Sequence, residues 1–176
     1  MRYSYWCWEK YLNVNQIKNI NKCRLHKGLD EKADSKKTSI VKFIKYTNAK
    51  PYLNDCINAI YSTNEREFKY SLFPFPDQAT LLHNTYKKGG EYNWHIDCTS
   101  HDNYDMKLTA LINISDTDYT GGKFKLWIGE NAITIDKFNN PGDMIMFRSF
   151  HLHKVTPILK GTRKTLTIFL SGPQLQ

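Results

Sequence analysis

The segment Phe68-Lys69-Tyr70-Ser71-Leu72 marks a change in the spacing of apolar residues along the chain. Its apolar residues alternate with polar ones, as expected for a strand with one buried face, whereas the apolar residues before it recur at helical spacing. After this segment, short apolar runs are separated by turn-forming sequences such as Gly89-Gly90, Gly121-Gly122 and Pro141-Gly142. The runs predicted to form strands are residues 78–86, 92–97, 107–114, 123–128, 132–135, 144–147, 153–156 and 163–170. About eight such strands predict a β-sandwich or jelly roll.

The first third of the chain has the pattern of two helices with one strand between them. Asn13 and Gln16 have the spacing of a capping box, and apolar residues then recur on one face, which predicts a helix over residues 14–25. Residues 40–46 have the composition of a strand. Pro51 suits the first turn of a second helix, because apolar residues follow it at helical spacing.

The length and composition are those of one globular domain. The chain has 176 residues, of which 40% are hydrophobic and 14% aromatic, enough to build a packed core. We expect a single domain over residues 1–176, mainly β with N-terminal helices. Within it, residues 1–65 are expected to form a helical support region and residues 66–176 the jelly-roll core.

The net charge and the cysteine pattern limit the cellular compartment and the classes of partner that the chain is expected to have. The formal net charge of +8 would favour an acidic partner, but the lysines are spread along the chain, so nucleic acid is not expected as the substrate. The four cysteines form no Cys-x-x-Cys pair, which disfavours a zinc knuckle and a disulfide scaffold. Without a signal peptide or an apolar run of about 20 residues, the chain is expected to be soluble and cytoplasmic, with no membrane partner.

Two histidine regions and one arginine indicate metal chemistry. His95 and Asp97 are two apart in a strand-like stretch, so their side chains would share a face and could bind one ion. His151 and His153 begin a later strand, and either could complete the set. Two imidazoles and one carboxylate on one face of a metal leave open positions that suit iron(II) and oxygen. Arg163 could hold the far carboxylate of a dicarboxylate co-substrate with two parallel hydrogen bonds.

A series of motifs resembles one enzyme family. The motifs are His95-x-Asp97, Tyr119-Thr120-Gly121-Gly122, Pro141-Gly142-Asp143 and His153-x-Val155-Thr156-Pro157-x-x-x-Gly161-x-Arg163. In this order they resemble the prolyl 4-hydroxylase-like iron(II)/2-oxoglutarate dioxygenases, particularly the small bacterial and phage members. The match spans residues 78–173. It implies a double-stranded β-helix, a jelly-roll barrel with the metal at its open end.

The resemblance implies a role for each matching residue. Iron(II) would be bound by His95, Asp97 and His153, which would form the catalytic centre. His153 is preferred to His151 because only His153 is followed by Val-Thr-Pro and, ten residues later, by Arg163. Arg163 would bind the distal carboxylate of 2-oxoglutarate. The other side chains implied to contact 2-oxoglutarate are Tyr86, Asn113 and Thr167.

Other residues near the motifs have weaker assignments. Tyr92 and Trp94 flank the metal triplet and are candidates for a wall of the substrate site. Residues 99–105 are expected to form a loop over the mouth of the site. The histidines expected to lie outside the metal site are His26, His83 and His101.

The implied reaction is hydroxylation of an unactivated C–H bond by O2, with decarboxylation of 2-oxoglutarate to succinate and with ascorbate as a supporting reductant. The favoured substrate is a prolyl residue in a peptide or protein. A hydroxylase of a free amino acid or small metabolite is the main alternative. A nucleic-acid demethylase is disfavoured because Phe169 stands where such enzymes carry a second arginine, six residues after Arg163. The expected setting is a bacterial or phage-infected cell.

Overall fold

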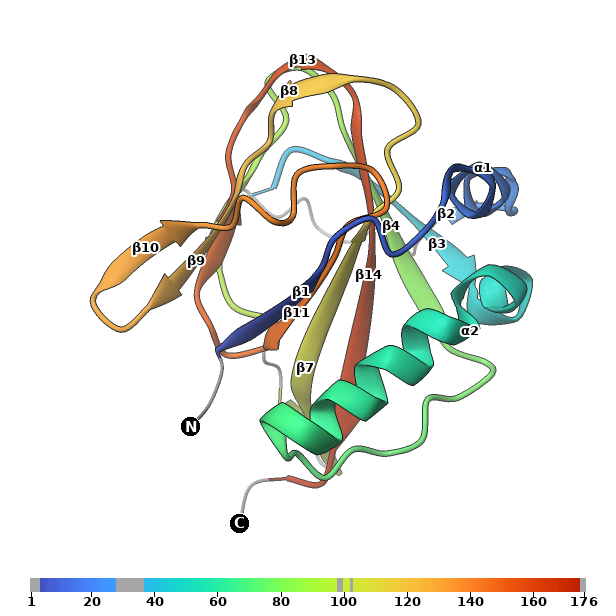
Figure 1. The fold of residues 1–176 in the computed structure, drawn as a ribbon, viewed down its shortest axis with the longest axis vertical. Coiled ribbons are helices and arrows are strands. Elements are labelled where there is room, and N and C mark those ends of the chain that lie inside the picture. The colour runs from blue at the N-terminus through green and yellow to red at the C-terminus, as the bar shows by residue number, and fades with distance from the viewer. Residues whose placement is uncertain (1–3, 28–36, 98–99, 102, 175–176) are drawn as a thin grey trace.

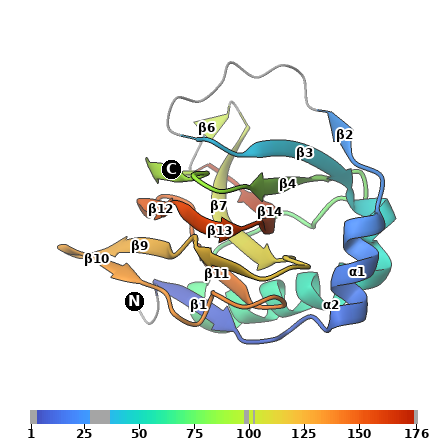
Figure 2. The same cartoon turned by 90° about the horizontal axis from the view of Figure 1, so that it is seen from above.

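Two antiparallel sheets form the body of the molecule, with both long helices on one side of it (Figures 1 and 2). The computed structural model describes residues 4–27, 37–97, 100–101 and 103–174. The main sheet has eight strands and the minor sheet four, and a separate two-stranded sheet lies at one end of the molecule (Figure 1). This arrangement confirms the expected β-rich jelly roll.

The strands follow the chain in an interleaved order. The main sheet runs, in spatial order, β1 (Tyr5–Trp8), β11 (Met144–Arg148), β7 (Tyr104–Asn113), β14 (Arg163–Gly172), β4 (Thr80–Tyr86), β3 (Ile40–Lys45) and β2 (His26–Lys27), with β6 (Ser100–His101) beside β7. The minor sheet runs β10 (Asn131–Thr134), β9 (Phe124–Ile128), β12 (His153–Val155) and β5 (Tyr92–His95). The third sheet pairs β13 (Ile158–Gly161) with β8 (Tyr119–Gly121). The helices are α1 (Val14–Lys22), α2 (Tyr46–Thr63) and a π-helical turn η1 (Asn64–Phe68).

Two hydrophobic clusters lie on opposite faces of the main sheet. Residues of β7 alternate, so Leu108 and Ile112 pack against the helices, whereas Leu111 faces the minor sheet. The space between the sheets is filled largely by aromatic rings, among them Phe124 of β9 and Phe147 of β11. The metal and co-substrate residues proposed from the sequence therefore lie on the side of the main sheet that the helices do not cover.

Both helices are confirmed, with different boundaries. The capping box of α1 is present, with Asn13 and Gln16 each accepting from the other's backbone amide at 3.0 Å, but the helix ends at Lys22. Helix α2 begins at Tyr46, directly after β3, rather than near Pro51. Pro51 is exposed, and so is Thr47, whose carbonyl the proline would leave unpaired within the helix. Water can bond that carbonyl, which explains why the helix continues through the proline.

The segment that first indicated the fold is not a strand. Phe68 ends η1, and none of residues 69–79, all of which are described, belongs to a strand. Its alternation is present in the burial, because Phe68 is buried and Lys69 exposed. The Asn64 side chain bonds the carbonyl and the amide of Tyr70 at 2.9 and 3.1 Å, and thereby takes the place of a neighbouring strand.

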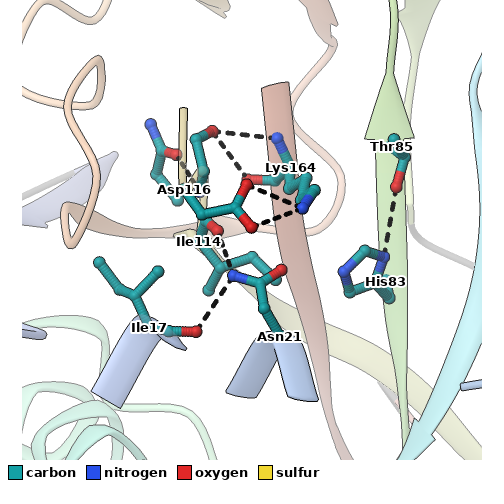
Figure 3. Close-up of polar contacts among 9 residues, drawn as sticks. Ile17, Asn21, His83, Thr85, Ile114, Asp116 and Lys164 are labelled. Carbon is teal, nitrogen blue, oxygen red and sulfur yellow. Dashed lines mark hydrogen bonds and ion pairs between the residues drawn. The ribbon is translucent and has the colours of Figure 1, made fainter. Parts of the chain in front are cut away.

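Residues 1–65 supply strands as well as helices. They contribute β1, β2 and β3, and β3 pairs along its whole length with β4. Figure 3 shows how α1 is fixed to this body: Asn21 donates to the carbonyls of Ile17 and Ile114 at 3.0 and 2.8 Å. The division at residue 65 stays a prediction. None of the helices among the described residues is long and apolar enough to span a membrane.

Candidate active site

Two strands of the minor sheet bring a possible metal-binding set together. His95 on β5 lies directly opposite His153 on β12, and Asp97 follows β5 by two residues. Asp97 lies between the two rings: its Oδ1 is 3.6 Å from His95 Nε2, and its Oδ2 is 3.3 Å from His153 Nε2. The three ligand atoms all lie within 4.8 Å of one another, close enough to bind a single ion.

Each imidazole is oriented by a hydrogen bond to the backbone carbonyl two residues before it. His95 Nδ1 lies 2.7 Å from the carbonyl oxygen of Asn93, and His153 Nδ1 lies 2.9 Å from that of His151. A carbonyl only accepts, so Nδ1 carries the hydrogen in each ring and Nε2 keeps its lone pair for a metal. Tyr92 stacks on His95 at 3.4 Å and holds that ring from its other side.

Asp97 is held by its backbone and by a threonine. Its amide donates to the carbonyl of Ser149 at 3.0 Å, and its carboxylate accepts a hydrogen bond from Thr109. Burial alone would raise the pKa of Asp97, but the neighbouring His153 and His95 and the hydrogen bond from Thr109 outweigh burial and hold the pKa below its usual value of 3.8. The carboxylate is therefore ionised at neutral pH, as a metal ligand must be.

His95 is equally prepared for metal binding. Burial, together with the neighbouring His153, lowers its pKa from 6.5 to about 4. The ring is consequently neutral at physiological pH, with its lone pair free. A pair of neutral imidazole nitrogens and one carboxylate matches the donor set of open iron(II) sites, so the residues present fit iron(II).

A cavity of about 80 Å³ extends from this set to Arg163 on β14. Arg163 is 1% exposed, and its Nε and Nη2 have no hydrogen-bond partner among the described residues. Its guanidinium lies between the rings of Tyr86 and Phe138, at 5.8 and 5.4 Å. A buried guanidinium with two unpaired nitrogens is costly unless an anion reaches it. The cavity thus fits a ligand with a carboxylate at the end away from the metal.

A glycine makes room for this arginine. Gly122 has a φ of +60°, and a Cβ there would collide with Ile158 Cδ1 and lie 2.9 Å from Arg163 Cδ. The Gly121-Gly122 motif therefore supports the path of the Arg163 side chain as well as the turn.

Several residues expected at the site line this cavity. Tyr86 is buried directly opposite Arg163, and burial raises its pKa to about 12, so the phenol stays protonated. Thr165 and Thr167 share the inward face of β14 with Arg163, as the alternation predicted. Tyr92 lines the cavity beside His95.

Two predicted site residues lie elsewhere. Asn113 is not among the described residues that line the cavity, and its amide donates to the Tyr119 hydroxyl at 2.9 Å and accepts from the Ser115 backbone at 3.1 Å. Trp94 points to the other face of the minor sheet, where its ring contacts Trp127 edge-on at 5.7 Å and Lys154 at 5.3 Å. Neither side chain is brought to the metal residues.

Two other histidines, His151 and His83, lie outside the metal set found among the described residues. His151 contributes its backbone carbonyl to His153 but is not part of the metal set found among the described residues. His83 lies on the helix-facing side of β4, 3.4 Å from the Thr85 hydroxyl (Figure 3). The expected loop over the mouth lies partly outside the described residues. Of its described part, Ser100–His101 pair with the start of β7.

Sequence reasoning missed three polar residues around the cavity. Lys37 and Asn84 line it, and Thr109 bonds Asp97. Asn84 could have been found, because it lies two residues before Tyr86 on a predicted strand and so shares its face. Lys37 ends a polar stretch, residues 27–37, whose composition is that of a loop, and the sequence carries no signal that it reaches the cavity.

Comparisons with known proteins agree with this geometry. The family model described as the 2OG-Fe(II) oxygenase superfamily matches residues 81–171, about half of the chain. A PKHD-type hydroxylase of Teredinibacter turnerae is 30% identical over 97 residues, which are 51% of this chain and 41% of that relative. The chain therefore spans less than half the length of the curated relative.

Solved structures share the whole fold. A prolyl-4-hydroxylase of Pseudomonas putida has a TM-score of 0.75 at 16% identity, covering 97% of this chain and 94% of that one. A prolyl hydroxylase of Trichoplax adhaerens, solved with a peptide of the hypoxia inducible factor oxygen degradation domain, has a TM-score of 0.68 at 19% identity, covering 95% of this chain and 83% of that one. At these identities the likeness concerns the fold.

Proposed function

Since the chain belongs to the 2OG-Fe(II) oxygenase superfamily, we propose that it is a hydroxylase in which His95, Asp97 and His153 hold iron(II) and Arg163 binds the distal carboxylate of 2-oxoglutarate. One observation carries this proposal. A buried arginine with two unpaired nitrogens shares a small cavity with a complete set of metal ligands. A dicarboxylate could bind the metal with one end and pair with the unpaired nitrogens of Arg163 with the other.

Iron(II) held by these residues would supply the oxidising chemistry: one oxygen atom of O2 would enter succinate as 2-oxoglutarate loses CO2, and the other would be inserted into a substrate C–H bond. The residues of the chain itself would bind and orient the 2-oxoglutarate. Arg163 Nε and Nη2 would donate hydrogen bonds to the carboxylate, and the protonated Tyr86 hydroxyl opposite can donate another. Leu82, Leu111 and Phe124 make the cavity wall apolar and keep water from the reacting atoms.

We further propose that the substrate is a prolyl residue in a peptide or protein. The curated relative is a PKHD-type hydroxylase, and two structural neighbours are prolyl hydroxylases, one of them with a bound peptide. Tyr92, which stacks on His95 and lines the cavity, is the aromatic side chain that we assign to contact a proline ring. Trp94 takes no part, because it faces away from the cavity.

The test is substrate oxidation by the full chain. The protein is incubated with Fe(II), ascorbate, 2-oxoglutarate and a proline-containing peptide library, and peptides are searched by mass spectrometry for a gain of one oxygen. We expect hydroxylated prolyl residues with wild type and none with His153→Ala. Turnover with free amino acids or with methylated oligonucleotides, and with no peptide, would reject the prolyl substrate while retaining the oxygenase.

A further inference from the structure

Lys37 and Asn84 are linked to the cavity by hydrogen bonds that end at Thr167. Lys37 Nζ donates to Asn84 Oδ1 at 2.8 Å, and Asn84 Nδ2 donates to Thr167 Oγ1 at 3.0 Å. All three residues line the cavity, and Asn84 and Thr167 are buried. Because 47 positions separate the first pair and 83 the second, this arrangement is a product of the barrel and not of local sequence.

The lysine fixes the direction of these bonds. An ammonium group can only donate, so the Asn84 amide must turn its oxygen toward Lys37 and its nitrogen toward Thr167. The Thr167 oxygen then accepts a hydrogen bond, and its own O–H stays available to donate. With the amide reversed, Thr167 would donate to Asn84 and present only lone pairs to the cavity.

The direction matters because of what the cavity has to hold. Thr167 shares the inward face of β14 with Arg163, four residues before it, and the guanidinium has two unpaired nitrogens. A guanidinium and a hydroxyl donor on one face both suit an anion, whereas a hydroxyl that only accepts would repel it. The donor state of Thr167 therefore complements Arg163.

We propose that Lys37 and Asn84 are positioning residues that keep the Thr167 hydroxyl as a hydrogen-bond donor to bound 2-oxoglutarate. This inference rests on the proposed function, since 2-oxoglutarate is the anion assigned to the cavity. Lys37 acts on the co-substrate through Asn84 and Thr167. Its ammonium group also lies 4.7 Å from the centre of the Tyr92 ring, which stacks on His95. The same lysine therefore contacts both Asn84 and the tyrosine beside the proposed metal ligands.

The test measures 2-oxoglutarate binding, without turnover, to the full chain loaded with nickel in place of iron. Calorimetry should give a Kd that rises about tenfold in Thr167→Val and about tenfold in Lys37→Met, the effect of losing one charge-assisted hydrogen bond. The double variant should bind no more weakly than Thr167→Val, because both substitutions remove the same bond. Asn84→Asp should match Thr167→Val, since its carboxylate accepts from Lys37 and also from Thr167.

Matched variants separate positioning from charge and folding. Lys42→Met removes an equal charge at an exposed position of β3 that does not line the cavity, and should leave the Kd unchanged. Lys37→Arg and Thr167→Ser keep the needed groups and should restore most of the affinity. Nickel binding by each variant reports an intact metal site, and Lys37→Leu replaces Lys37→Met if the latter loses it.

The outcomes distinguish the two proposals. Losses that add in the double variant, or no loss in Lys37→Met, would overturn the positioning role. Failure of the wild type to bind 2-oxoglutarate, or binding that Arg163→Met leaves unchanged, would instead contradict the proposed function.

Discussion

Two histidines only two positions apart have different roles at the proposed metal centre. His153 directs its Nε2 toward Asp97, whereas His151 offers its backbone carbonyl to His153 Nδ1. A substitution of the His151 side chain leaves this backbone carbonyl, and its hydrogen bond to His153, in place. The side chain of one histidine and the backbone of the other therefore serve the same site.

This difference gives a prediction at the scale of single residues. With metal at about 100 times its Kd, binding should stabilise the wild type by about 2.7 kcal/mol, which raises the Tm by several degrees. His151→Ala should keep this shift and His153→Ala should lose it, because only the latter removes a ligand. Differential scanning fluorimetry with and without Co(II) measures both. A shift that survives in His153→Ala and disappears in His151→Ala would reverse the ligand assignment.

Residue spacing predicts some site residues and misses others for a physical reason. His95 ends β5, Asp97 lies two residues beyond it, and Arg163 begins β14, so period-two spacing in the sequence locates them. Lys37 reaches the cavity only because its backbone pairs with Tyr92 across the barrel. Such a contact between distant segments depends on sheet closure, which no local pattern in one sequence encodes.

At the scale of elements, the turn after β8 controls the Arg163 side chain. Gly122→Ala should destabilise the protein by about 2–4 kcal/mol, through a positive φ and the collision with Ile158 and Arg163. Gly129→Ala is the matched control, because its φ of +59° is nearly the same and nothing lies within 4 Å of its Cβ position. It should cost about 1 kcal/mol. Urea unfolding compares them, and equal costs would show that Arg163 does not need this space.

The elements differ in how well the sequence predicts them. Strands β4, β7, β9, β11 and β14 were predicted from apolar runs, because each is buried on at least one face. Strand β1 and the β8–β13 pair were missed, since they are short and their residues mostly half-buried or exposed. Phe68–Leu72 shows the opposite error: its side chains alternate in burial, but the Asn64 side chain supplies the hydrogen bonds of a strand partner.

At the scale of the whole molecule, burial of histidines makes the metal-free protein sensitive to acid. Burial lowers the pKa of His83, His95 and His151 below 6.5, to about 4 for His95. As the pH falls below 6.5, the unfolded chain binds protons before the folded one, so stability decreases toward pH 4. The shift of His95 alone corresponds to about 3 kcal/mol.

Urea unfolding of the metal-free protein at pH 7.5 and pH 4.5 measures this loss. His83→Gln should reduce it without touching the metal centre, because His83 lies on the helix side of β4. A free energy of unfolding that stays constant between these pH values would contradict the buried, neutral state of these histidines.

The hydrogen bonds from both Nδ1 atoms to backbone carbonyls also affect which ion the protein acquires in a cell. They set the two lone pairs in place as the strands fold, before any ion arrives. A preformed set of two nitrogens and one carboxylate binds nickel, copper and zinc more tightly than iron(II), following the Irving–Williams order. Iron(II) would therefore occupy the site only where it is far more available than the ions that bind more tightly. Protein made in zinc-rich medium should carry zinc and be inactive until the zinc is chelated and replaced by iron(II).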